Sequence, residues 1–234
     1  MKTHLFTHTV KLAELLDANP QLVLLLSRWN IPLGFGEKTV AEVCAEQGVS
    51  PGFFLIVCRI YSDRRYLPDE ETLSLVEMDD MIRYLHASHI YYLQDRIPHI
   101  GNHLQHIVEQ CEPVYRGMIR RFFDAYCREV EEHFKYEEET VFPYIRELME
   151  GAAPSGYRIR DFQKNHSNIE DKLHDLRNIL IKYLPAELSP ADRISITIDT
   201  YRLSEDVERH SVIEEQVLVP AVMLMERKRD GKGA

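Results

Sequence analysis

The chain lacks the features of a membrane protein, a secreted protein or a nucleic-acid-binding protein. Its 234 residues carry 28 Lys and Arg against 38 Asp and Glu, a formal net charge of −10. Nucleic acids and anionic membranes are therefore not expected partners, because both are bound through clustered basic residues. No apolar run approaches the roughly 18 residues that span a bilayer, and residues 1–8 lack the apolar stretch of a signal peptide. We expect a cytoplasmic protein.

Cysteine is also scarce, and its spacing is uninformative. The four cysteines form no Cys-x-x-Cys pair, and each falls in an apolar helical context: Cys44, Cys58, Cys111 and Cys127. Apolar surroundings favour buried thiols over metal ligands or disulfides.

Glycine and proline are sparse between residues 72 and 143, and almost no stretch alternates polar and apolar residues. Apolar residues recur instead at helical spacing, which predicts an all-α protein. We expect an antiparallel up-down four-helix bundle over residues 73–226. Its helices would run over 73–110, from Pro113, through Phe162 to Leu180, and from a cap at Ser189 to Ala221. A small helical N-terminal domain (1–66) would precede the bundle, and a flexible tail (227–234) would follow it.

One short pattern occurs twice in the predicted bundle. His133 is followed by Glu137 and Pro143, and His210 by Glu214 and Pro220, with the same spacing. On a helix, positions i and i+4 share a face, so each copy directs an imidazole and a carboxylate to one point. A carboxylate on an apolar helix stripe is costly unless it is paired or bound to a metal. The prolines are expected only to kink or end their helices.

Counting residues from the nearest inter-helix turn adds two histidines to the two His-Glu pairs and gives six candidate ligands. With turns near residues 112 and 188, six residues on apolar stripes lie 21 to 26 residues from their turn, which is roughly 33 Å along the helix: His89, His133, Glu137, His166, His210 and Glu214. His103 and His106 are too close to the turn to join this layer, and His86 is a reserve ligand or second-layer candidate.

Four imidazoles and two carboxylates suit iron, zinc or manganese. Carboxylates that can bridge, flanked by terminal imidazoles, indicate a binuclear centre. We predict two non-haem iron ions per chain, joined by an oxo or hydroxo bridge. Six protein ligands for two ions would leave positions open for a small ligand such as O2 or NO.

At these residues the chain resembles the hemerythrin-like superfamily and, within it, the di-iron repair-of-iron-centres proteins. The match runs over roughly residues 73–225 and rests on His133-x3-Glu137, on His166 and on His210-x3-Glu214, with His89 in a similar first ligand segment. The resemblance implies a role in the response to nitrosative or oxidative stress, with a damaged iron–sulfur protein as partner. Residues 12–61 resemble the small domain that precedes the bundle in that family. Residues 31–40 occupy the region of its Cys-Cys pair, and they contain no cysteine.

Two other functions remain open. A reversible binder or sensor of O2 or NO would need the same centre. Residues 39–60 also resemble a helix-turn-helix with Gly48 in the turn, which would suit a metal-sensing transcription regulator. Its second helix is almost entirely apolar, however, and offers few contacts to bases or phosphates. The sequence commits to no enzymatic reaction, and a homodimer is compatible with it.

Overall fold

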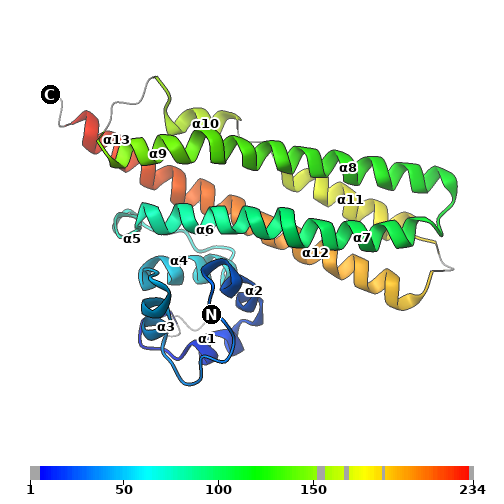
Figure 1. Cartoon of the computed structure of the whole chain (residues 1–234), viewed down its shortest axis with the longest axis horizontal. Coiled ribbons are helices and arrows are strands. Elements are labelled where there is room, and N and C mark those ends of the chain that lie inside the picture. Colours follow the sequence, from blue (N-terminus) through cyan, green and yellow to red (C-terminus); the bar gives the residue numbers. More distant parts are fainter. Residues whose placement is uncertain (1–5, 152–155, 166–168, 186–187, 232–234) are drawn as a thin grey trace. The chain divides into compact units, whose positions relative to one another are not determined.

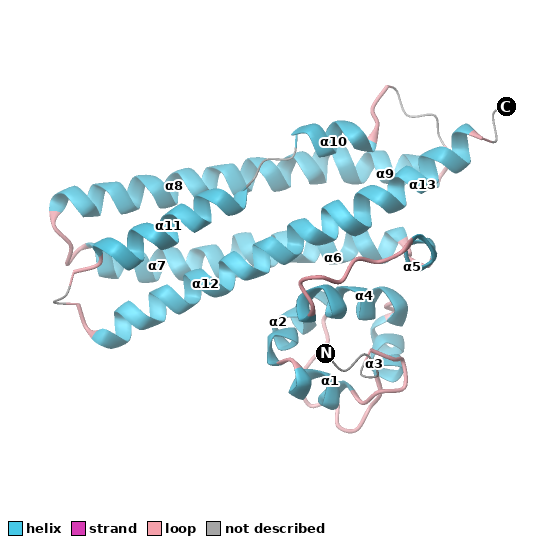
Figure 2. Ribbon diagram, turned by 180° about the vertical axis from the view of Figure 1, so that it is seen from behind, coloured by secondary structure: helices cyan, strands magenta, loops and turns pink. Residues whose placement is uncertain are grey.

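The computed structural model describes residues 6–151, 156–165, 169–185 and 188–231. These residues form helices and no β-strand, with one isolated bridge between Lys11 and Thr39 (Figure 2). The predicted all-α class, a helical bundle with an N-terminal helical region, is confirmed. By internal contacts, the chain divides into a first unit (residues 1–88, 144–160 and 209–234) and a second unit (residues 89–143 and 161–208).

The N-terminal helices belong to the first unit. They are α1 (Leu12–Ala18), η2 (Pro20–Leu22), α2 (Val23–Leu26), η3 (Ser27–Trp29), α3 (Val40–Gln47), α4 (Pro51–Ser62) and α5 (Glu70–Ser74). A capping box at Thr39 starts α3, and Gly48 ends it in the left-handed conformation (φ 61°). That conformation is cheap for glycine because it has no Cβ.

An aromatic cluster anchors these helices to α6 (Met78–Tyr91) within the first unit. The Trp29 ring stacks on Tyr84 at 4.7 Å between centroids, and Phe53 and Phe54 pack on the same indole. Two polar contacts add to it: the Asp80 carboxylate accepts from the backbone N–H of Ser50, and the Arg83 guanidinium donates to the carbonyl of Gly48.

Helix α4 is buried along most of its length, from Phe53 to Tyr61. The recognition helix of a helix-turn-helix must present its side chains to a DNA groove, and these side chains lie in the core instead. No single helix of the described ranges is long and apolar enough to cross a membrane. The bent pair α3 and α4, at 116°, meets that criterion by length and composition.

The second unit holds the bundle's hydrophobic core. Helices α7 (Ile97–Val108), α8 (Pro113–Tyr136), α11 (Ile169–Tyr183) and most of α12 (Pro190–Ile213) lie side by side in both views (Figures 1 and 2). Their inner faces supply the apolar stripes read from the sequence, with Tyr126, Val130, Leu173, Leu176 and Leu203 among the buried residues. The predicted start at Pro113 and the predicted cap are both present, since the Ser189 hydroxyl accepts from the backbone N–H of Asp192 at 3.1 Å.

The long helices depart from the prediction at several points. The first is preceded by the separate α5 and is interrupted by a π-helical segment, η4 (Tyr92–Arg96). Two further π-helical segments, η5 (Glu137–Val141) and η6 (Glu214–Leu218), follow α8 and α12. The prolines at 143 and 220 do not end their helices, because α9 (Phe142–Met149) and α13 (Val219–Asp230) continue beyond them. A short α10 (Ile159–Asn165) precedes α11.

Helix α13 continues to Asp230, into the segment predicted as a flexible tail. Contacts within the first unit hold it in place. The buried Glu226 carboxylate accepts hydrogen bonds from the Tyr144 hydroxyl and, at 2.9 Å, from the backbone N–H of Ile159. Arg158 pairs with Asp230 at 3.0 Å.

The four cysteines are free thiols. Cys44, Cys58 and Cys111 are buried, as predicted, and Cys127 is half-buried.

Candidate metal centre

Glu137 lies between two imidazoles of the second unit. Its Oε2 is 2.9 Å from Nε2 of His89, which projects from α6, and its Oε1 is 3.2 Å from Nε2 of His133, one turn earlier on α8. The carboxylate is fully buried, and both histidines are nearly so. The predicted i, i+4 geometry is therefore present, and His89 completes it from another helix.

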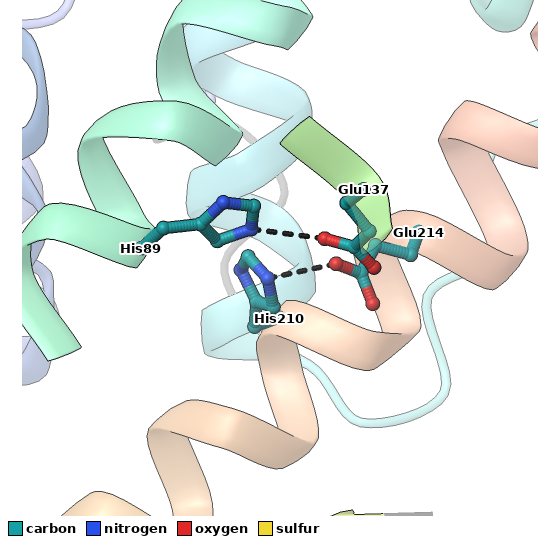
Figure 3. A group of neighbouring side chains, drawn as sticks. All are labelled: His89, Glu137, His210 and Glu214. Atoms are coloured by element: carbon teal, nitrogen blue, oxygen red, sulfur yellow. Dashed lines mark ion pairs between the residues drawn. The ribbon is translucent and has the colours of Figure 1, made fainter. Parts of the chain in front are cut away.

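The second copy of the pattern has the same geometry. His210, at the end of α12, places Nε2 2.7 Å from Oε1 of Glu214, the first residue of η6. Both side chains are fully buried. Figure 3 shows the two ion pairs as dashed lines, one from His89 to Glu137 and one from His210 to Glu214.

Four of the six predicted ligands come together. One ligand atom from each of His89, Glu137, His210 and Glu214 lies within 4.8 Å of the others. Two buried carboxylates need compensating positive charge, and mixed imidazole and carboxylate donors suit iron, zinc and manganese. The donor set therefore fits a divalent or trivalent metal ion.

The other two predicted ligands stand apart. His133 contacts Glu137 but is not one of the four clustered residues. It also lines a cleft of about 580 Å³ in the second unit, together with Glu129, Glu132, Tyr136 and Lys172. His166 lies outside the described residues, so its role stays a prediction.

Three further histidines of the bundle have other surroundings. His103 lies 3.9 Å and His99 3.5 Å from the carboxylate of Asp199 on α12. His86, the reserve candidate, is exposed. None of the three belongs to the cluster of four.

Glu138 contributes a contact that the sequence did not reveal. On a regular helix Glu138 would lie off the apolar stripe, yet its Oε1 is 2.7 Å from Nδ1 of His89. With a metal ion bound, a carboxylate at Nδ1 would keep the proton there and leave the lone pair of Nε2 for the ion. The ring plane is also held, because the imidazole stacks on Phe134 at 4.1 Å and on Phe142 at 5.6 Å between centroids.

Glu138→Ala should weaken metal binding by about 10–100-fold, as is typical when an outer partner of a histidine ligand is lost. Glu138→Gln should lose less, since its amide oxygen can still accept from Nδ1–H. A competition titration with a chromophoric chelator measures the change. The control is Glu139→Ala, which alters the exposed neighbouring carboxylate; equal affinity for Glu138→Ala and Glu139→Ala would contradict the role of Glu138.

Comparison with known families agrees with this geometry. The family model described as the hemerythrin HHE cation-binding domain matches residues 80–222, more than half of the chain. The chain belongs to this family. The matched range contains all six predicted ligands together with η4, η5 and η6. A search of curated proteins found no match. The chain is thus a metal-binding, hemerythrin-like helical protein.

Proposed function

We propose that this protein holds a pair of non-haem iron ions and acts in the response to nitrosative or oxidative stress, by repairing damaged iron–sulfur clusters. The observation that carries the metal assignment is the buried group of His89, Glu137, His210 and Glu214 in a cation-binding family. Two ions need more donors than these four, and His133, in contact with Glu137, and His166 are the residues proposed to supply them.

The chain's own residues prepare the site. Glu138 holds the proton on Nδ1 of His89, and the rings of Phe134 and Phe142 stack on that imidazole and shield it from water. We propose that a small molecule reaches the site through the cleft that His133 lines. Bound iron would supply an open coordination position and one-electron chemistry for O2 or NO.

A reversible O2 or NO carrier or sensor is the second candidate, since the same cleft and the same donors serve it. The regulator alternative loses its main support because α4 is buried in the first unit.

Anaerobic reconstitution with Fe(II) tests the proposal. We expect about two iron ions per chain by elemental analysis, and a Mössbauer signature of a coupled pair after oxidation. One metal ion or none would overturn the di-iron assignment.

Exposure of the reduced protein to O2 and NO then separates the two candidates. Complete recovery of the reduced spectrum on removal of the gas would indicate a carrier or sensor. Restored activity of a nitric-oxide-damaged iron–sulfur enzyme in a mixture with the reduced protein would support repair, and no restoration would count against it.

A further inference from the structure

Three helices of this protein contain the same backbone irregularity at the same distance from a proline. The π-helical segments begin at Tyr92, Glu137 and Glu214, and a proline follows six residues after each of these positions, at Pro98, Pro143 and Pro220. No other π-helical segment occurs in the described ranges. The three segments are the ones that carry or closely follow His89, Glu137 and Glu214.

The hydrogen bonds repeat as well. In each helix the residue before the proline donates its N–H to the carbonyl five residues back, instead of the usual four. Ile97 donates to Tyr92, Phe142 to Glu137 and Val219 to Glu214. In η5 and η6 the accepting carbonyl therefore belongs to the clustered glutamate itself.

Proline explains why the turn widens at these positions. It has no N–H to give to the carbonyl four residues back, and its ring crowds that carbonyl in a regular α-helix. A turn with one extra residue moves the carbonyl aside, so the helix continues instead of breaking. Pro51, Pro113 and Pro190 lie at the first turns of α4, α8 and α12, where no carbonyl precedes them in the helix, and no π-helical turn accompanies them.

The wider turn keeps the metal-site residues on the buried face. Residues eight apart on a regular α-helix are rotated by roughly 80° from each other. His133, Glu137 and Val141 are nevertheless all buried, at 6%, 0% and 0% exposure, and so are His210, Glu214 and Leu218 in the other copy. An extra residue after the glutamate offsets the rotation, so both the metal-site residues before it and the apolar residues after it face inward.

We infer that Pro98, Pro143 and Pro220 are positioning residues for the metal centre. Each proline fixes a π-helical turn. Because of this turn, the buried His or Glu and the apolar residues that follow it face the same side. The expected effect on metal binding rests on the proposed function. The effect of each proline on the helix backbone does not depend on a bound metal.

Pro143→Ala and Pro220→Ala, made separately, are the test variants. Alanine restores an N–H and removes the ring, so we expect the turn to tighten toward a regular α-helix and rotate the two helical parts against each other. The affinity for Co(II) should fall by about 10-fold or more, with a changed visible spectrum of the bound ion. Pro190→Ala, at the first turn of α12, is the matched control and should retain the wild-type affinity and spectrum.

A compensating deletion separates positioning from general damage. Removal of Thr140 from the Pro143→Ala variant takes out the extra residue of η5, so a regular α-helix would restore the alignment and Co(II) binding. Wild-type affinity and spectrum in both proline variants would overturn the inference. The inference would also be overturned if Pro143→Ala lost Co(II) affinity and the Thr140 deletion did not restore it. The same holds if Pro143→Ala failed to fold and remained unfolded after the deletion.

Amide hydrogen exchange of metal-free protein keeps this test distinct from that of the proposed function. Changed protection at Phe142 in Pro143→Ala, or at Val219 in Pro220→Ala, would support the π-helical mechanism even if the wild-type protein bound no iron. Unchanged protection in both would reject the mechanism whatever the metal content.

Discussion

Alanine in place of Glu137 or Glu214 should abolish paired metal binding while leaving the protein folded. Each carboxylate is fully buried and lies within 3 Å of a histidine nitrogen, and each is an anionic donor of the kind that iron requires. We expect occupancy to fall from two ions to one or none. The loss of affinity should exceed the about 10–100-fold expected for an outer partner such as Glu138. Elemental analysis after anaerobic reconstitution measures the change.

The gain in stability on metal binding should be lost together with the carboxylate, because a ligand stabilises a protein only as far as it binds the folded state. Only the wild type should gain a higher melting temperature on addition of iron. Glu139→Ala changes an exposed carboxylate next to Glu137 and should behave as wild type. Two ions retained in both Glu137→Ala and Glu214→Ala would refute the site.

Trp29→Ala should remove a large part of the stability of the first unit. The indole is 6% exposed and packs against the rings of Tyr84 and Phe54 at 4.7 and 4.8 Å between centroids. Truncation of a buried aromatic residue costs about 3–5 kcal/mol, since it leaves a cavity and removes the ring stacking. Urea unfolding followed by circular dichroism gives the change in the free energy of unfolding.

Leu33→Ala is the matched control for that experiment, because Leu33 lies in the same N-terminal region and is 68% exposed. It should change the free energy of unfolding by less than about 0.5 kcal/mol. A change below about 1 kcal/mol for Trp29→Ala would show that the aromatic cluster does not anchor the N-terminal helices to α6. The sequence contains one tryptophan, so wild-type fluorescence reports on this contact directly.

Helical periodicity sufficed to predict the fold class and much of the site. The stripes through Tyr126, Val130 and His133 follow from a 3.6-residue repeat, and distance from the turns brought His89 to the level of Glu137. Both arguments treat a helix as a regular rod, although η4 lies between His89 and its turn. Whether the six residues bind iron stays a prediction.

The π-helical turns and the contact of Glu138 were missed for a shared reason. A straight α-helix places Glu138 roughly 100° away from Glu137, on the side expected to face solvent. Glu138 instead lies in η5, where the turn is wider, and meets His89 from another helix. The six-residue spacing from Glu137 to Pro143 and from Glu214 to Pro220 is visible in the sequence, but its link to a π-helical turn is visible only in the backbone hydrogen bonds.

The buried thiols have a consequence for redox experiments on this protein. Burial raises the pKa of Cys44 to about 12 and that of Cys127 to about 11, and it also raises the pKa of Cys58 and Cys111. At neutral pH roughly one Cys127 side chain in ten thousand is therefore a thiolate, the form that alkylating agents and peroxides attack. Electron counting during titrations with O2, NO or peroxide should consequently report on the bound metal, with little contribution from sulfur oxidation.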